Sequence, residues 1–585
     1  MVPVRDYGRR VEGLIEHSES EMLEEIEPPT GKVPIATLAH GLDRVLFNPG
    51  VHWVQDPRSR VYNFNPFVQN VPDIKDFGFE RLPPFIRSSR DTIMRGLAES
   101  KGKRFAGSTS SLTGLLCHIY FLLSQDHTVD VRTMAAPFST ARTTFTPGQR
   151  MPTAVVFNHK NGVYMIDSDS TDNDDSEWNI LMWLGTMLES FLTLPRNEFE
   201  KLLRTLSPEN TFEKQPEAYR YSQSKSFVMR SQLDCVDPRL PGSGVFDIKT
   251  RAALPLRMDN LNFKENSGYL ITSLHGYLHS FDREYYDLIR SAFLKYSFQA
   301  RIGNMDGIFL AYHNTARIFG FQYVPLEEMD RRLFGDYLEK KPNGISLGQY
   351  ETGGTAAGWR IFKKCVRLLE EIASEIAECF PGKSVTCLAE TRKNRGVMRI
   401  WVQPVDEETE PTNDDEIPMV TPSLKKPIVL LEVTTHNFLD GQPVLGPGAV
   451  FGSKKPWTVQ WSISRSTLSE RIIRKELVEA KHRKNRPTSY PAGVDAENLE
   501  EFIKNLGFGN PETMPNAKNF KRPDAFIRRC RMIARAGALE AERLKLEDEA
   551  RGVQVLGQED ALYPEGQLSS ASNKSNGDKI SFASL

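Results

Sequence analysis

The chain has 585 residues, of which 39% are hydrophobic and 26% charged, with 74 Lys and Arg against 76 Asp and Glu. This length exceeds what one hydrophobic core serves, so we expect about two or three domains. The near-neutral balance excludes a chain that is basic throughout, and any contact with nucleic acid must depend on local patches. The longest apolar stretch, residues 114–123, is too short to span a bilayer.

The cysteines and the N-terminus bear on the compartment. Six cysteines are scattered without a C-x-x-C pair, which argues against a zinc site, an iron–sulfur cluster or a disulfide framework and favours a reducing environment. The start of the chain lacks an apolar signal core and turns acidic by Glu16, so it resembles neither a secretory signal nor a mitochondrial presequence. Either the chain is not imported or its leader is missing from this sequence.

The N-terminal third is expected to contain a disordered acidic arm (1–30) and an α+β region (31–175). Within that region a basic loop precedes a predicted apolar helix, and an anion could bind at the start of this helix, although an ordinary Ser/Thr cap is the favoured interpretation. The basic side chains of the loop are Lys101, Lys103 and Arg104.

An acidic loop at 167–175 has the composition of a calcium site but the wrong spacing. An EF-hand needs Gly at the sixth position and Glu at the twelfth, where this chain has Asp172 and Trp178. We interpret the segment as a solvated loop that caps the next helix.

The region 176–345 is predicted to be an α/β core. Its patterns predict a helix, two strand-like runs joined by a turn-rich segment, a long helix and a hairpin, at 178–194, 219–236, 244–253, 282–302, 307–313 and 317–324. Beyond it we expect a C-terminal α+β region (346–490), a charged helical segment (491–550) and a disordered tail (551–585).

The stretch "SQLDCVDPRLPGSGVFDIKT" (231–250) carries the candidate chemistry. Alternation along a strand places Asp247 and Lys249 on one face and turns Ile248 to the core. If the flanking strands pair as a hairpin, Asp234 and Asp247 converge, and two carboxylates suffice for Mg²⁺ or Mn²⁺ when substrate phosphate supplies further oxygens. The backbone carbonyl of Ile248 could add a ligand, and Lys249 could orient the attacking water or offset charge on the phosphorane.

An Asp-x-Lys pair alone is a weak motif, because ion pairs at strand ends are common and contribute little. The context strengthens it: a preceding helix carries Glu189, and a following helix carries Tyr296 and Gln299. This order and residue set resemble the αβββαβ core of the PD-(D/E)XK nuclease superfamily, with the last pair similar to the helix tyrosine and glutamine of its RecB-like exonucleases. The fold class expected is therefore α/β, with N-terminal and C-terminal α+β additions.

Longer blocks resemble one family within that superfamily, the fungal mitochondrial RNA-processing family called Pet-one-two-seven, across residues 32 to about 335. The blocks are HGLDRVLFNPGVHWVQDPRSRVYNF (40–64), GSTSSLTGLLCH (107–118), MRSQLDCVDPRLPGSGVFDIKTRA (229–252), REYYDLIRSAFLKYSFQARIGNMDGIFLAYHNT (283–315) and RIFGFQYVPLEEMD (317–330).

The resemblance implies a mitochondrial matrix protein at the inner surface of the inner membrane that acts in RNA 5′-end processing and turnover and cooperates with the mitochondrial RNA polymerase. It also implies a 5′-to-3′ exoribonuclease in which Asp234, Asp247, Lys249, Glu189 and Gln299 are catalytic, with Glu189 also a metal ligand. The missing presequence departs from the family pattern.

Two main functions stay open from the sequence, beside a third possibility in which the C-terminal charged helices are the main interaction surface and the core only supports them. In the first, a metal-dependent exoribonuclease draws in a single-stranded end with Lys101, Lys103, Arg104 and Arg251, and aromatic side chains such as Tyr296 contact the RNA. Arg251 could equally be a solvent-exposed strand-end residue. In the second, the nuclease-like fold is a scaffold that binds RNA or RNA polymerase without catalysis.

Overall fold

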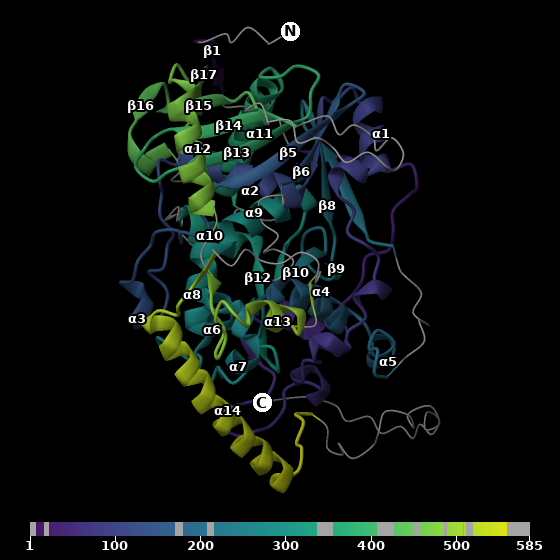
Figure 1. Cartoon of the computed structure of the whole chain (residues 1–585). Coiled ribbons are helices and arrows are strands. Elements are labelled where there is room, and N and C mark those ends of the chain that lie inside the picture. The colour runs from purple at the N-terminus through teal and green to yellow at the C-terminus, as the bar shows by residue number, and fades with distance from the viewer. Residues whose placement is uncertain are drawn as a thin grey trace, which may run out of the picture.

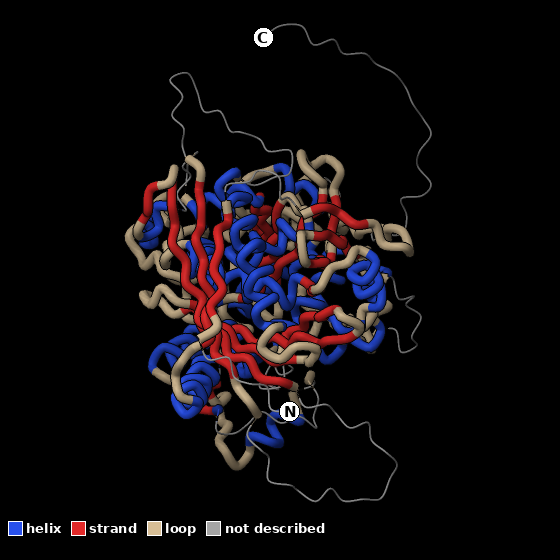
Figure 2. The backbone as a smooth tube through the Cα atoms, turned by 90° about the horizontal axis from the view of Figure 1, so that it is seen from above, coloured by secondary structure: helices blue, strands red, loops and turns tan. Residues whose placement is uncertain are grey.

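The computed structural model describes residues 8–16, 23–169, 179–206, 216–335, 355–405, 426–449, 455–484, 488–506, 508–509 and 519–557. The strands of these segments form two large sheets and a small two-stranded one, and helices occupy the space between the large sheets (Figures 1 and 2). None of the helices in these segments combines the length and apolar character needed to cross a bilayer.

The larger sheet has 12 strands drawn from distant parts of the sequence. Strand β4 runs parallel to both of its neighbours, and the other pairs are antiparallel. The order is β1 (Arg10–Ile15), β17 (Trp457–Arg465), β15 (Val429–Leu439), β14 (Met398–Pro404), β13 (Val385–Thr391), β5 (Thr153–Lys160), β6 (Val163–Ser168), β4 (Phe105–Ser108), β8 (Phe227–Gln232), β7 (Tyr219–Gln223) and β2 (Glu24–Ile26), with β16 (Gln442–Val444) beside β15.

The second sheet has five strands and positions the candidate site. Its order is β3 (His52–Trp53), β12 (Ile318–Pro325), β11 (Gly307–His313), β10 (Val245–Ala252) and β9 (Cys235–Val236). Strands β10 and β11 are parallel and the other pairs antiparallel. A parallel pair needs a long crossover, which helices α6 to α9 supply here. Strands β18 (Thr488–Ser489) and β19 (Phe520–Lys521) form the small sheet.

The helices cover both faces of the sheets. They are α1 (Thr92–Ser100), α2 (Thr109–Leu123), α3 (Ala136–Ser139), α4 (Ile180–Thr193), α5 (Arg196–Glu200), α6 (Leu254–Met258), α7 (Phe263–Asn266), α8 (Phe281–Ser291), α9 (Phe293–Gly303), α10 (Leu326–Phe334), α11 (Ala356–Ala377), α12 (Glu470–Lys484), α13 (Leu499–Lys504) and α14 (Ala525–Arg551). Short 3-10 helices, the first at Leu42–Phe47 and the last at Gly446–Ala449, lie in the connecting segments.

Alternation along the strands explains how the large sheet is packed. Phe105 and Phe227 point to the main core, which contains the apolar side chains of α2, α9 and α11. Their neighbours Ala106 and Val228 point to the opposite face and pack against Leu97 of α1. Helix α9 packs against α2 and against strands of both sheets, so it lies between them.

The α/β class and the order of helices and strands between 180 and 325 are confirmed, with local corrections. The run at 219–236 is not one strand: β7 and β8 form a hairpin in the large sheet, and only β9 joins the smaller one. The helix expected at 282–302 is broken at Ala292, whose φ of −143° leaves helical values. No proline or glycine marks that break in the sequence.

The N-terminal arm is also corrected, because residues 10–15 and 24–26 form strands of the large sheet rather than disordered chain. Strands from four of the predicted regions share that sheet, so the proposed boundaries do not separate its parts. Helices α13 and α14 lie in the region predicted as a charged helical segment. Most of the acidic loop at 167–175 and most of the tail at 551–585 lie outside the described residues.

Candidate functional site

The pairing of β9 with β10 brings two aspartates together. Cys235 pairs with Phe246, so Asp234 and Asp247 occupy the next opposed position. Gly244 closes the turn between the strands with a φ of +79°, where a Cβ would lie 2.8 Å from a backbone oxygen. The Asp234 carboxylate accepts a hydrogen bond from the backbone N–H of Ile248 at 2.9 Å. The two carboxyl groups are also hydrogen-bonded to each other.

Lys249 stands beside this pair, as the alternation predicts. Its Nζ lies 2.5 Å from Oδ2 of Asp247 and 5.3 Å from the centre of the Tyr296 ring on α9. Ile248 points away into the second core cluster. The ammonium group is therefore fixed between a carboxylate and an aromatic face.

Two further predicted residues reach the same place from helices. Glu189 comes from α4, whose Gly185 faces Thr250 of β10, and it accepts a long hydrogen bond from Gln232 at 3.5 Å. Gln299 comes from α9, and its buried Oε1 has no hydrogen-bond partner in the described part of the chain. Both residues line the cavity that contains the aspartates.

This cavity has a volume of about 450 Å³. The predicted residues that line it are Asp234, Asp247, Ile248, Lys249, Glu189, Tyr296 and Gln299. The structure thus brings together residues 110 positions apart along the chain, from Glu189 to Gln299. It adds Lys295 and the serine-rich start of α2, which the sequence reasoning did not place here.

The acids in the cavity are hard to ionise without a cation. Burial and then the Asp247 carboxylate raise the pKa of Asp234 well above its usual range. Burial, followed by the carboxylates of Glu217 and Asp247, raises the pKa of Glu189 to about 7. Burial lowers the pKa of Lys249, but the carboxylates of Asp247 and Asp234 outweigh it and the net pKa is raised, so the amine stays protonated.

These observations test whether a divalent cation fits. The Asp247 carboxylate raises the pKa of Asp234, and a hard cation would relieve this repulsion between the two carboxylates. The Oε1 of Gln299, which has no partner among the described residues, is an additional oxygen in the same cavity. Magnesium-like ions are commonly held by one or two carboxylates plus water and substrate oxygens. The residues present therefore fit such an ion.

Glu189 is a third acidic side chain of the cavity. Within the described segments, no group of three or more His, Cys, Asp or Glu side chains is arranged to hold a metal ion. Glu189 lines the same cavity as Asp234 and Asp247, and its role as a direct metal ligand stays a prediction. Ile248 lines the cavity, and the role of its carbonyl as a ligand stays a prediction.

Arg251 is placed differently from both sequence interpretations. It follows Asp247 and Lys249 on the same face of β10, but its side chain is 8% exposed and lies 3.7 Å from Glu284 of α8. Burial and the nearby Arg257 lower its pKa to about 10. It is therefore neither a solvent-exposed strand end nor part of the cavity lining.

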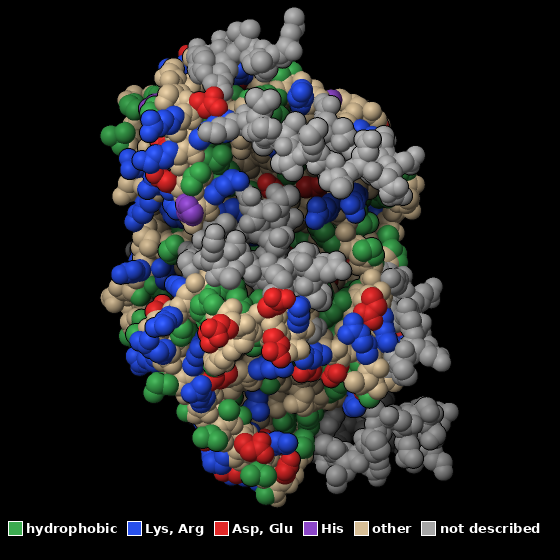
Figure 3. Space-filling view, viewed as in Figure 1, with side chains coloured by type: hydrophobic (Ala, Val, Ile, Leu, Met, Phe, Trp, Pro, Cys, Tyr) green, Lys and Arg blue, Asp and Glu red, His purple; other side chains and the backbone are tan. Residues whose placement is uncertain are grey.

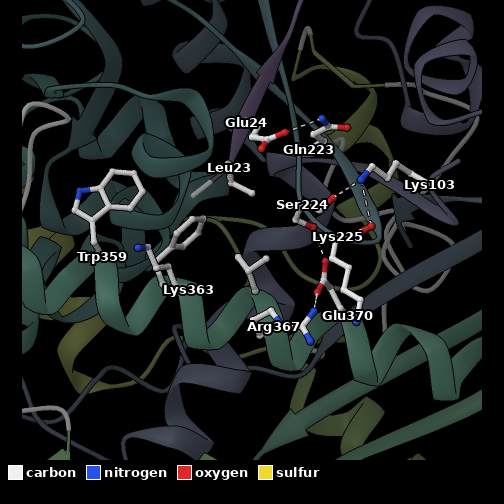
Figure 4. Close-up of a pocket in the computed structure, with 12 residues that line it drawn as sticks. Leu23, Glu24, Lys103, Gln223, Ser224, Lys225, Trp359, Lys363, Arg367 and Glu370 are labelled. Carbon is white, nitrogen blue, oxygen red and sulfur yellow. Dashed lines mark hydrogen bonds and ion pairs between the residues drawn. The ribbon is translucent and has the colours of Figure 1, made fainter. Parts of the chain in front are cut away.

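The predicted basic loop also lies apart from the acidic cavity. Lys103 lines a second pocket between α11 and the β7–β8 turn, where its Nζ donates to the backbone oxygens of Ser224 and Lys225 (Figure 4). Arg104 pairs with Glu378, and Lys101 is exposed at the end of α1. Strand β4 separates this loop from α2, so the combined anion site is not formed.

The start of α2 nevertheless opens on the acidic cavity. Ser108, Thr109 and Ser110 line it, and the Ser108 side chain makes no capping bond to the helix, contrary to the favoured interpretation. Lys295 precedes Gln299 by one helical turn on α9, a spacing that would have indicated it from the sequence once Gln299 was assigned.

Over the face seen in Figure 3, Lys and Arg are spread among acidic side chains rather than gathered in one stripe.

The fold and this cavity define an α/β protein with an Asp–Asp–Lys site in a cavity between two sheets. Comparison with known proteins gives the family. The family described as mitochondrial protein Pet127 matches residues 85–374. The "mRNA degradation protein pet127, mitochondrial" of Schizosaccharomyces pombe is 34% identical over 67% of this chain and 72% of its own length. The chain belongs to the Pet127 family, as its sequence blocks had indicated.

A second relative is PET127 of Saccharomyces cerevisiae, a protein provisionally named as a component of the mitochondrial translation system. It is 38% identical over 54% of this chain, and the matched part covers 40% of that protein's length. Among solved structures, K. lactis Dxo1 in complex with manganese is similar at a TM-score of 0.28 and 9% identity, covering 68% of this chain and 99% of that one. A likeness of that degree supports no argument about the site.

Proposed function

We propose that the protein is a divalent-cation-dependent exoribonuclease that hydrolyses phosphodiester bonds of mitochondrial RNA from the 5′ end. The observation that carries the proposal is the hydrogen-bonded pair Asp234 and Asp247 with Lys249 at 2.5 Å in one cavity. An isolated buried acid pair is costly, and such perturbed groups gather at functional sites. The family relatives, one of them named for mRNA degradation, support RNA as the substrate.

Asp234 and Asp247 would hold the cation, with the Ile248 carbonyl as a further oxygen. When bound, the cation (Mg²⁺ or Mn²⁺) would polarise the scissile phosphate and lower the pKa of the attacking water. Lys249 remains protonated, so it serves as a fixed positive charge that offsets charge on the phosphorane and orients water, and not as a base. Tyr296 holds the lysine in place.

Glu189 and Gln299 have supporting roles in this proposal. A carboxyl group with a pKa of about 7 is suited to take a proton from the attacking water near neutral pH. The Gln299 side chain, whose buried Oε1 lacks a partner among the described residues, would accept a hydrogen bond from that water or from the substrate. Both roles depend on the cavity that these two side chains share with Asp234, Asp247 and Lys249.

The cellular setting follows from the relatives. Their names place them in mitochondria, which supports a mitochondrial location for this protein. Matrix-side association with the inner membrane and contact with the mitochondrial RNA polymerase come only from the family resemblance, and they stay predictions.

The decisive experiment is degradation of a 5′-monophosphorylated, 3′-labelled RNA with Mg²⁺ or Mn²⁺. We compare the wild type with Asp247→Ala and Lys249→Ala. Asp237→Ala is the matched control, because the Asp237 carboxylate accepts a hydrogen bond from Arg239 and does not line the cavity. Loss of at least about 100-fold in both site variants and none in the control is expected. Equal degradation by all four proteins would refute the catalytic role.

The alternative is a scaffold that binds RNA or polymerase without catalysis. The observation in its favour is that the Saccharomyces cerevisiae relative is named for the mitochondrial translation system and not for RNA hydrolysis, and that a fold alone does not establish catalysis. It predicts that RNA binding persists in Asp247→Ala and that no hydrolysis occurs in the wild type with either cation. The same assay, read for binding as well as for cleavage, separates the two functions.

A further inference from the structure

The rim of the acidic cavity carries large apolar side chains that contact water. Phe85 is 66% exposed and Met182 58% exposed, and both line the cavity that contains Asp234 and Asp247. Exposed apolar side chains scattered over a surface need no explanation, but a pair at the mouth of a polar cavity marks a contact site. In the described part of the chain, no aromatic ring lies against Phe85.

Phe85 is held in this exposed position by its neighbours. Pro83 and Pro84 precede it, and their rings fix φ and stiffen the segment. The next residue, Ile86, is anchored because its backbone oxygen accepts a hydrogen bond of 2.5 Å from the guanidinium of Arg230. Arg230 is itself 2% exposed and paired with Asp91. The ring is thus presented to solvent by a rigid support.

The position of Met182 on α4 gives the distance between the rim and Glu189. It stands seven residues before Glu189 on α4, and both side chains line the cavity, so they share one helix face. At 1.5 Å per residue the rim lies about 10 Å along the helix axis from Glu189. A stacked strand rises about 3.4 Å per nucleotide, so the rim lies up to about three nucleotides from the acidic centre.

The cavity below the rim suits a phosphate backbone. Lys249 and Lys295 both line it, and Lys295 makes no ion pair or hydrogen bond with the described residues. Hydroxyl groups of Ser108 and Ser110 line it as well. Cations and hydroxyls inside, with a phenyl ring outside, match a single nucleic acid strand, which has charged phosphates and flat apolar bases.

We propose that Phe85 and Met182 form a clamp for one unpaired nucleobase of the RNA whose phosphates enter the cavity. This inference rests on the proposed nuclease function and adds the conformation of its substrate: the strand is single and unstacked at the rim. Phe85 is a positioning residue, because it touches a base near the scissile bond and not the reacting atoms. A duplex end must open before it can be cleaved.

The test measures binding, so that it does not depend on turnover. The full chain carrying Asp247→Asn is titrated with a short 5′-monophosphorylated RNA that contains 2-aminopurine at one of its first nucleotides. Quenching of the fluorophore at one position and its loss in Phe85→Ala are expected. Stacking on an aromatic side chain is worth roughly 5- to 100-fold in affinity per base, and Phe85→Ala should lose that factor.

Three comparisons distinguish stacking from a general defect. Phe526→Ala removes an exposed phenyl ring from α14 and should bind like the parent. Phe85→Tyr should retain binding, whereas Phe85→Leu should not. An abasic nucleotide at the quenched position should lower the RNA affinity of the parent protein by the same factor as Phe85→Ala. The abasic nucleotide should not lower the affinity of Phe85→Ala further, because the stacking contact needs both the ring and the base.

Contrary results have separate meanings. Unchanged binding by Phe85→Ala, or equal losses by Phe85→Ala on abasic and intact RNA, would overturn the clamp. A Phe85-dependent dimer in sedimentation, with unchanged RNA affinity, would also overturn it by assigning the rim to a second copy of the chain. If the wild type neither binds nor cleaves RNA, the proposed function fails as well; if it cleaves RNA normally without a Phe85 effect, only the clamp fails.

Discussion

Replacing Glu189 by Gln should stabilise the metal-free protein, and the gain should grow with pH. Burial and then the carboxylates of Glu217 and Asp247 raise the pKa of Glu189 to about 7 from an ordinary 4.5. The folded state therefore binds this proton more tightly than the unfolded state. Stability that this group contributes is fully present below about pH 4.5 and is lost as pH rises through about 7.

The pKa difference sets the size of the effect. Raising a carboxyl pKa from 4.5 to about 7 corresponds to at most about 3 kcal/mol of folding free energy once both states are ionised. Most of this cost, about 2 kcal/mol, develops between pH 5 and pH 8. Glutamine has the same shape and no charge, so Glu189→Gln should gain about 3 kcal/mol at pH 8 and only about 1 kcal/mol at pH 5.

Denaturant unfolding with EDTA, followed by tryptophan fluorescence, measures the gain. Taking the difference between variant and wild type at each pH removes the titration of all groups that do not interact with residue 189. Glu549→Gln, an exposed substitution on α14, is the control and should show no pH-dependent gain. Mn²⁺ should reduce the gain, because a cation favours the ionised carboxylates of the wild type. An equal change at both pH values would refute the reasoning.

Three other expectations follow from buried groups and from the cavity. Burial lowers the pKa of His118 to about 4, so its contribution to stability, complete above about pH 6.5, should be lost as pH falls toward 4; His118→Gln should flatten that part of the urea-unfolding profile by up to about 3 kcal/mol. Asp330→Ala should cost about 3–5 kcal/mol, measured by urea unfolding, because it leaves Arg301 charged and fully buried after the loss of a 2.6 Å pair. Lys295→Ala should weaken RNA binding and reduce the slope of log affinity against log salt by about 1, whereas Lys101→Ala, outside the cavity, should do neither; equal slopes would exclude a phosphate contact by Lys295.

The sequence predicts the centre of the site because short-range rules determine it. The two-residue period of β10 puts Asp247 and Lys249 on one face, and the turn ending at Gly244 lets β9 return Asp234 to the opposed position. Helix periodicity likewise predicts that Tyr296 and Gln299 share a face. These inferences need no knowledge of the rest of the fold.

Predictions that depend on distant pairing were less successful. The pattern of 219–236 shows extended chain, but only the parallel pairing of β8 with β4 reveals that β7 and β8 belong to another sheet. Alternation gives the face of Arg251 correctly, yet its burial results from α8, which brings Glu284 above it. Lys103 and Arg104 lie close to Ser108 in the sequence. They precede β4, whereas Ser108 is its last residue, so the strand places them at opposite ends.

The proposed exoribonuclease activity depends on Asp234 and Asp247 acting together as a cation site. Titration of Mn²⁺ against the wild type, with free ion followed by electron paramagnetic resonance, measures this directly near neutral pH. We predict one tight ion in the wild type and in Asp237→Asn, and loss of that ion in Asp234→Asn and in Asp247→Asn. Tight binding of Mn²⁺ by either of the last two variants, with unchanged affinity, would contradict the claim.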